Sequence, residues 1–159
     1  FMTAIFPEVL KAVPSIQFLI CGGDSPERFR AYESGNVQVV GWVADLAPLF
    51  ARCIATVAPL RYGAGFKGKV ATSLAHGLPC VGTQIAIEGT GLCEGDGFLT
   101  MKSPRDYART ILKLHRNGQF WSDLSHRGLS AVERLYSRRA AIEAWKSILT
   151  DLDLSVRES

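Results

Sequence analysis

A short glycine-rich segment carries the residue types best suited to holding an anion. Gly63, Gly65 and Gly68 alternate there with Lys67 and Lys69. Glycine lets the backbone approach a ligand closely, so that amide N–H groups reach it, and lysine adds full positive charge. This combination favours a phosphorylated or otherwise anionic ligand. It matches neither GxxxxGK(S/T) nor a GxGxxG set after the first strand of a domain, and a plain connection with solvated lysines is the competing interpretation.

The predicted secondary structure places this segment at the edge of a parallel sheet. The apolar run 54–58 is typical of a strand, the stretch 70–76 is typical of a helix that ends at Gly77, and Pro79 opens a second apolar run. Strand, glycine loop, helix and strand make a βαβ unit. In such units the loop lies at the carboxyl edge of the sheet, and the helix directs free N–H groups toward a bound ligand.

Several motifs follow one another in an order that is found in a known enzyme family. They are PLRYGAGFKGK, a helix rich in small residues, GLPCVGT and IEGTG. In this order they resemble the C-terminal, donor-binding domain of retaining GT-B glycosyltransferases of family 4, in the glycosyl transferases group 1 class. The matching residues are Pro59, Gly63, Gly65, Lys67, Lys69, Gly77, Pro79, Glu88 and Gly89. The flanks agree as well, from VPSIQFLICGGD to the Ser137 segment, so the resemblance covers nearly the whole chain.

The resemblance implies an α/β fold with a Rossmann-like parallel sheet and helices on both faces. It implies a single nucleotide-sugar-binding domain over 1–159, with a C-terminal helix at 137–152. In that family a strand in the middle of the sheet comes before the first helix. The chain starts on Phe1, inside a predicted helix. We therefore expect that strand to be missing from this fragment, leaving an unfilled slot between two strands or a rearrangement that fills it.

The resemblance also implies an activity and a set of binding residues. The donor would be a UDP- or GDP-sugar, and the acceptor, a polysaccharide or lipid-linked glycan, would bind a missing N-terminal domain, so that the fragment alone is expected to be inactive. Amide groups, the helix dipole and lysine would stabilise the leaving diphosphate, so neither a cofactor nor an obligatory metal is expected. No catalytic residue is assigned. The residues expected at the donor phosphates are Gly63, Gly65, Phe66, Lys67, Gly68 and Lys69, and those expected near the nucleoside or sugar are Trp42, Val43, Thr72, Ser73, Glu88 and Gly89.

Two positions depart from the family pattern. Many members hold the donor with two glutamates, and the matching residues here are Ala64 and Thr72. The second departure matters more, because that carboxylate normally accepts hydrogen bonds from the ribose hydroxyls. Two alternatives stay open as a result: a non-catalytic domain that keeps the fold, and another nucleotide-binding Rossmann-like module, such as a dehydrogenase or methyltransferase domain. For Trp42, packing into the domain is the alternative to a contact with the base.

Helices near the two ends of the chain are expected from apolar spacing. The first covers 1–13, where Pro7 is expected to kink the axis because proline removes a backbone hydrogen bond. The last lies within 137–152, its apolar stripe is expected to be buried, and the end at 155–159 is expected to fray. The stripe consists of Ile142, Trp145, Ile148 and Leu149.

Composition narrows the classes of partner and compartment. The chain has 159 residues, 47% of them hydrophobic and 21% charged, and a net charge of +3, which fits a soluble globular α/β domain and offers no concentrated basic stripe for nucleic acid. Four widely spaced cysteines without a CxxC pair argue against a disulfide or metal framework and favour the reducing cytoplasm. Apolar runs stay well short of the roughly 20 residues that span a bilayer. A basic cluster, Arg134, Arg138 and Arg139, leaves peripheral contact with the inner face of the membrane open beside a merely solvated role.

Overall fold

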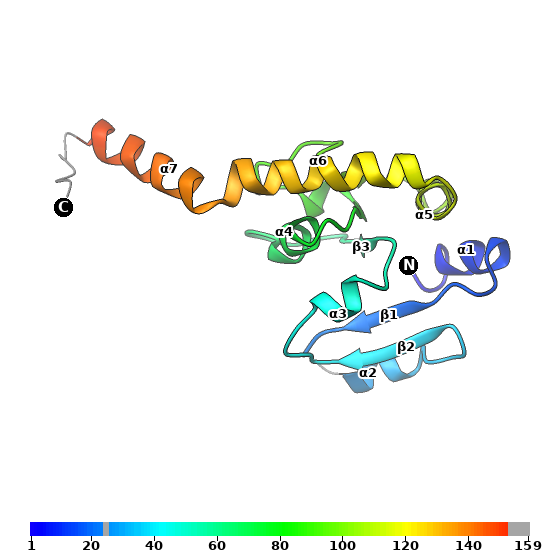
Figure 1. Ribbon diagram of the computed structural model, residues 1–159. Coiled ribbons are helices and arrows are strands. Elements are labelled where there is room, and N and C mark those ends of the chain that lie inside the picture. Colours follow the sequence, from blue (N-terminus) through cyan, green and yellow to red (C-terminus); the bar gives the residue numbers. More distant parts are fainter. Residues whose placement is uncertain (24–25, 153–159) are drawn as a thin grey trace.

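The computed structural model describes residues 1–23 and 26–152, and the end expected to fray, 155–159, lies outside the described residues. Helices and short strands alternate through most of the chain before three helices close it (Figure 1). In chain order the elements are α1 (Phe6–Ala12), β1 (Phe18–Cys21), α2 (Pro26–Arg30), β2 (Val37–Gly41), α3 (Ala47–Phe50), β3 (Thr56–Ala58), α4 (Gly68–Ala75), β4 (Cys80–Gly82), the 3-10 helix η1 (Gln84–Ala86), β5 (Phe98–Thr100), α5 (Pro104–Arg116), α6 (Gly118–Tyr136) and α7 (Arg138–Asp151).

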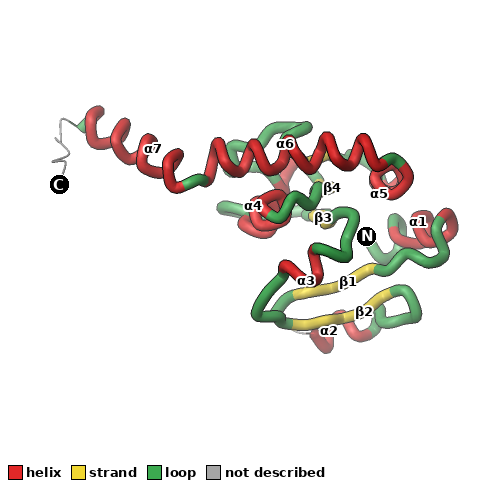
Figure 2. The backbone as a smooth tube through the Cα atoms, viewed as in Figure 1, coloured by secondary structure: helices red, strands yellow, loops and turns green. Residues whose placement is uncertain are grey.

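The named strands form two parallel sheets. β1 pairs with β2, and β3, β4 and β5 form a three-stranded sheet in that order. Successive strands within each sheet are joined by helical connections, as parallel pairing requires (Figure 2). The Rossmann-like α/β class expected from the sequence is confirmed.

Helices cover both faces of the three-stranded sheet. Successive residues of a strand point to opposite faces, and β4 shows this clearly. Cys80 packs in one core cluster with Val70 and Leu74 of α4, whereas Val81 packs in a second cluster with Tyr107 of α5. α6 supplies residues to both clusters. The packing of α4 against the sheet therefore fixes where the loop that precedes this helix ends.

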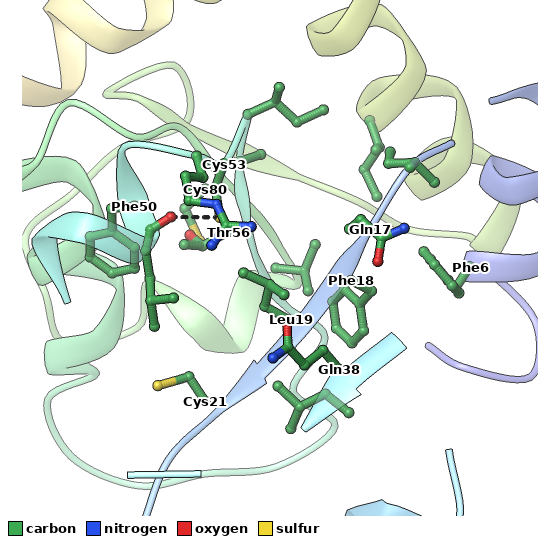
Figure 3. A pocket seen from close by; sticks show the side chains of 18 of the residues that line it. Phe6, Gln17, Phe18, Leu19, Cys21, Gln38, Phe50, Cys53, Thr56 and Cys80 are labelled. Atoms are coloured by element: carbon green, nitrogen blue, oxygen red, sulfur yellow. Dashed lines mark hydrogen bonds between the residues drawn. The ribbon is translucent and has the colours of Figure 1, made fainter. Parts of the chain in front are cut away.

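An inter-sheet cavity of about 710 Å³ separates the two sheets. It is lined by β1 on one side and by β3 on the other, with further side chains from α1 and α3; Figure 3 labels Phe18 and Leu19 of β1 and Thr56 of β3 around it. In the described part of the chain β1 pairs only with β2, and β3 only with β4. Each of these strands thus has one unpaired edge, and the slot expected between two strands is present.

The helices at the two ends differ from the prediction. α1 begins at Phe6 rather than Phe1, because Pro7 lies in the first turn, where a helix has no N–H bond for proline to remove; the expected kink is therefore absent. α7 contains no buried residue, and the exposed fraction of the Trp145 side chain is 64%. The predicted burial of the stripe at Ile142, Trp145, Ile148 and Leu149 is wrong, because α7 extends away from both sheets after Ser137 (Figure 1).

Candidate functional site

The glycine loop leaves the end of β3 and leads directly into α4. Gly65 has a φ of 71°, a left-handed conformation that glycine adopts without steric cost, and no atom lies within 4 Å of the point where a Cβ atom would be. The backbone on this side of the loop is therefore open. Gly63 is extended, with a φ of 159°, and the loop from Tyr62 to Phe66 is exposed.

The amino end of α4 offers unpaired backbone donors. Lys67 occupies the N-cap position and makes no side-chain capping bond, and the first turn contains no acidic residue. The first N–H groups of a helix have no partner within the helix and carry the positive end of its dipole. The glycine loop leads directly into this end of the helix, and contact of these N–H groups with an anion over Gly65 stays a prediction.

The two lysines of the loop lie in different environments. Lys67 is only 7% exposed, and its Nζ donates to the carbonyl oxygen of Gly63 at 3.4 Å. An ammonium group has three donors, and among the described residues Lys67 has neither an ion pair nor a second hydrogen bond. Lys69 is exposed on the first turn of α4 and lines the inter-sheet cavity. Lys67 is thus a largely buried residue whose ammonium group has no counter-ion among the described residues.

A second loop, after β4, is tied to the glycine loop. The hydroxyl group of Thr83 donates to the carbonyl oxygen of Leu60 at 2.6 Å, and the Thr83 N–H donates to the carbonyl oxygen of Ala58 at 3.2 Å. Glu88 and Gly89 are exposed on this second loop, and Gly89 has a φ of 72°. The start of the second loop therefore lies beside the end of β3, and a role of Glu88 and Gly89 near the sugar stays a prediction.

Trp42 and Val43 follow β2, at the carboxyl end of the other sheet. The side chain of Trp42 is 74% exposed, so the interpretation that it packs into the domain is wrong. Its Cδ1 atom lies 3.6 Å from the point where a Cβ atom on Gly23 would be, which places the indole beside the end of β1. Val43 is half-buried. The glycine loop and Trp42 thus lie at the carboxyl ends of strands on opposite sides of the inter-sheet cavity.

Thr72 and Ser73 point in different directions from α4. Thr72 is half-buried and lines the inter-sheet cavity. Ser73 is fully buried; its hydroxyl oxygen lies 2.7 Å from the hydroxyl oxygen of Thr56 and donates to the carbonyl oxygen of Leu78 at 2.8 Å. Ser73 therefore joins α4 to β3, and it has no exposed atom for a nucleoside or sugar. Adjacent helical residues differ by about 100° in direction, which explains why only one of the pair reaches the cavity.

Burial is the main cause of the pKa shifts of Cys80, Tyr107 and Tyr136. Burial raises the pKa of the Cys80 thiol to about 12, so this cysteine is protonated and unreactive at neutral pH. Burial also raises the pKa of the Tyr107 and Tyr136 hydroxyl groups. Within residues 1–23 and 26–152, no group of three His, Cys, Asp or Glu side chains is arranged to hold a metal ion. None of the helices described combines the length and apolar character that a bilayer crossing requires.

Two residues that bond to the loops were not identified from the sequence. Thr83 and Tyr136 both bond to backbone carbonyl groups of these loops, Thr83 at Leu60 and Tyr136 at Thr90. The partners are 23 and 46 residues apart in sequence. A lone threonine after a strand and a lone tyrosine at a helix end carry no motif, so only the fold brings them to the site.

Comparison with known proteins identifies a family and solved structures of similar fold. The sequence model described as Glycosyl transferases group 1 matches residues 1–117. The structure of Anabaena Alr3699/HepE in complex with UDP and glucose superimposes with a TM-score of 0.76 at 12% identity, over 92% of this chain and 44% of that chain. Sucrose-phosphate synthase (tll1590) from Thermosynechococcus elongatus gives 0.68 at 21% identity, over 91% and 41%, and TarM gives 0.70 at 18%, over 87% and 30%. No curated protein matches the chain.

These likenesses show the fold. It is similar to that of the C-terminal domains of GT-B glycosyltransferases, as the sequence predicted. The chain spans less than half the length of each of the three solved proteins.

Proposed function

The chain belongs to the glycosyl transferases group 1 family, and from this premise we propose that its glycine loop binds the diphosphate of a nucleotide sugar during sugar transfer. Within that role the loop holds the donor while an acceptor is glycosylated. Gly63, Gly65, Phe66, Lys67, Gly68 and Lys69 form the phosphate-binding segment.

Lys67, a largely buried lysine without an ion pair among the described residues, is the observation that carries this proposal. A buried cation is costly unless a counter-charge or several hydrogen bonds compensate it. Among the described residues Lys67 has one long hydrogen bond, to Gly63, and as the N-cap of α4 it follows the open backbone at Gly65. A diphosphate would satisfy the ammonium group and the helix N–H groups together.

The same positive groups, the Lys67 ammonium and the N–H groups of the loop and helix, would also assist the transfer reaction. When a nucleoside diphosphate leaves a sugar, negative charge grows on its phosphate oxygens. Prearranged amide dipoles and a partly buried ammonium stabilise that charge without reorganisation. We therefore expect a metal-independent, retaining reaction of the family 4 type, in which Lys67 and the amide groups of 65–68 supply the positive field.

The identity of the donor is narrowed by analogy with a neighbour of similar fold. One structural neighbour was solved with UDP and glucose, which supports UDP as the first nucleotide to test, with GDP as the second. Trp42, exposed at the end of β2, is the side chain proposed to flank the base, and Glu88 and Gly89 are proposed to lie near the sugar.

The proposal extends to the class of acceptor and to the cellular location of the enzyme. A polysaccharide or lipid-linked glycan remains the proposed acceptor, held by another part of the enzyme. The cysteine usage supports a cytoplasmic enzyme, and the exposed basic residues Arg138 and Arg139 are the groups available for contact with an acidic membrane surface.

Calorimetric titration of the full chain with UDP, GDP and ADP tests the proposal. Lys67→Met keeps the apolar stem and removes the charge, and we expect it to weaken diphosphate binding by about 10- to 100-fold, the range of one charge-assisted hydrogen bond. Lys146→Met is the matched control, since it removes one exposed lysine from α7, a helix outside the glycine loop and α4. Equal nucleotide affinity in the wild type and Lys67→Met would remove the binding mechanism.

Thr72 is the observation that favours a second function, a non-catalytic domain that retains the fold. The residue faces the inter-sheet cavity as a half-buried hydroxyl, where the family pattern has a carboxylate. In that case the chain would bind UDP, GDP and ADP with similarly weak affinity.

A further inference from the structure

The carboxyl end of α6 touches both loops of the candidate site. Tyr136 is the last residue of this helix. Its hydroxyl group donates to the carbonyl oxygen of Thr90, and its ring meets the ring of Phe66 edge to face, with centroids 5.4 Å apart and an interplanar angle of 83°. Phe66 belongs to the glycine loop and Thr90 to the loop after β4. One side chain therefore joins the two loops.

The loop after β4 is the firm side of this connection. Thr90 is only 4% exposed, its hydroxyl group donates to the carbonyl oxygen of Ile87 at 2.6 Å, and that hydroxyl oxygen accepts from the Leu92 N–H at 3.2 Å. Its backbone carbonyl is the group that Tyr136 holds. The helix end therefore anchors to a loop that is already closed on itself.

Neighbouring residues of α6 fix the position of Tyr136. Leu135 packs against the core and lies beside Gly91, where its Cδ2 atom is 3.5 Å from the point a Cβ atom would take. Arg134 pairs with Asp96 at 3.0 Å. The tyrosine is thus presented from a helix end that is held on both sides, and its hydroxyl group is partly buried, which raises its pKa and keeps it protonated as a donor.

The glycine loop is the exposed side of the connection. Phe66 is 57% exposed and stands between Gly65 and Lys67. Among the described residues, Tyr136 is its one aromatic partner. Glycine-rich backbone loses more conformational entropy on ordering than other backbone, so a contact that orders the loop before a ligand arrives lowers the cost of binding.

We propose that Tyr136 is a positioning residue of the donor site, which holds Phe66 against the loop after β4 so that the amides of 65–68 are ordered before the diphosphate binds. This inference rests on the proposed function, and it assigns to the α6–α7 junction a role in the affinity of the site. Tyr136 contacts no ligand itself; it acts through Phe66 and Thr90.

Two variants and one control separate this role from simple helix packing. Tyr136→Phe removes the hydroxyl group and keeps the ring, whereas Tyr136→Leu removes both contacts. Trp121→Phe is the matched control: Trp121 lies near the other end of α6, and its Nε1 donates to the carbonyl oxygen of Ile54 at 2.7 Å. All three changes delete one bond from α6 to a backbone carbonyl, but only the first two touch the loops.

The experiment measures UDP and uridine affinity together with amide hydrogen exchange of 63–68 in the ligand-free chain. We expect Tyr136→Phe to weaken UDP binding about fivefold, the equivalent of one neutral hydrogen bond, and Tyr136→Leu to weaken it further. Uridine affinity should not change, because the nucleoside lacks the diphosphate. Exchange at 63–68 should quicken in both Tyr136 variants and stay at the wild-type rate in Trp121→Phe.

The outcomes distinguish the two proposals. Wild-type UDP affinity and wild-type exchange at 63–68 in both Tyr136 variants would overturn the positioning role while leaving the proposed function intact. A wild-type chain that binds neither UDP nor GDP would overturn the proposed function, and the exchange rates alone would then decide whether Tyr136 orders the loop. Should Tyr136→Leu fail to fold, Tyr136→Phe decides by the same two measurements.

Discussion

Gly97→Ala is expected to destabilise the packing on which α4 rests. Gly97 precedes β5 and has a φ of 79°, and a Cβ atom there would lie 2.5 Å from the Cα atom of Gly128 in α6 and 2.9 Å from the Cδ2 atom of Leu74 in α4. The substitution therefore strains the backbone and also forces α6 and α4 away from the strand.

The expected loss in free energy of unfolding is the sum of these two effects, backbone strain and overpacking. A left-handed conformation costs a residue with a side chain about 1–2 kcal/mol, and an overpacked core costs about 1–3 kcal/mol. The free energy of unfolding should fall by about 2–5 kcal/mol, a large share of the stability of an ordinary domain.

Gly95→Ala is the matched control because it isolates the backbone effect. Gly95 has a φ of 90°, and the nearest atom to its added Cβ, the Nη1 atom of Arg127, lies 3.6 Å away, at ordinary contact distance. This variant should lose only the strain, about 1–2 kcal/mol.

Urea denaturation monitored by circular dichroism gives the free energies of unfolding of Gly97→Ala and Gly95→Ala. We expect Gly97→Ala to be less stable than Gly95→Ala by about 1–3 kcal/mol. Equal stability of the two variants would refute this expectation, since the close approach of Gly97 to α6 would then carry no energetic weight.

Three further predictions concern α4 and the core behind it. Ser73→Ala should lower the free energy of unfolding by about 1–3 kcal/mol, since it strands the hydrogen-bonding groups of Thr56 and Leu78; calorimetry should show unchanged UDP affinity, and a loss of affinity with normal stability would contradict this. Cys80 should resist alkylation in the folded chain at mildly alkaline pH, while the exposed Cys21 reacts. Burial raises the pKa of Cys80 to about 12, so the stability that the neutral thiol contributes is complete below the pKa of an unfolded cysteine and is lost as the pH rises toward about 12. Urea melts at a series of pH values would show this loss. Thr72→Glu should raise affinity for UDP but not for pyrophosphate, because a carboxylate can accept from ribose hydroxyls; calorimetry that finds equal gains for both would contradict the ribose assignment.

Local sequence signals predicted the central βαβ unit well. The turn at Gly77, whose φ is 68°, ends α4 close to the predicted position, and Pro79 then leads into β4. Ser103, a residue type that favours the N-cap position, caps α5: its side chain accepts from the Asp106 N–H at 3.2 Å. Glycine conformations and helix caps depend on adjacent residues, so a linear sequence contains them.

The misplaced features depend on partners that the sequence does not specify. The spacing of Ile142, Trp145 and Ile148 does produce one apolar face on α7, but periodicity cannot say whether another element covers that face. Likewise, the sequence shows that Lys67 adds a positive charge to the glycine loop, but not that its ammonium group bonds to the carbonyl oxygen of Gly63. Site residues that act across long separations, such as Tyr136, are invisible until the fold is known.

The inter-sheet cavity has a consequence for how the protein behaves in concentrated solution. The unpaired edges of β1 and β3 present backbone N–H and C=O groups that pair with no other strand of the described structure. Such edges are templates for an extended segment of a neighbouring molecule, and one inserted segment could bond to both at once. We therefore expect self-association to grow with protein concentration, and nucleotide titrations repeated across a dilution series would separate ligand affinity from this intermolecular pairing.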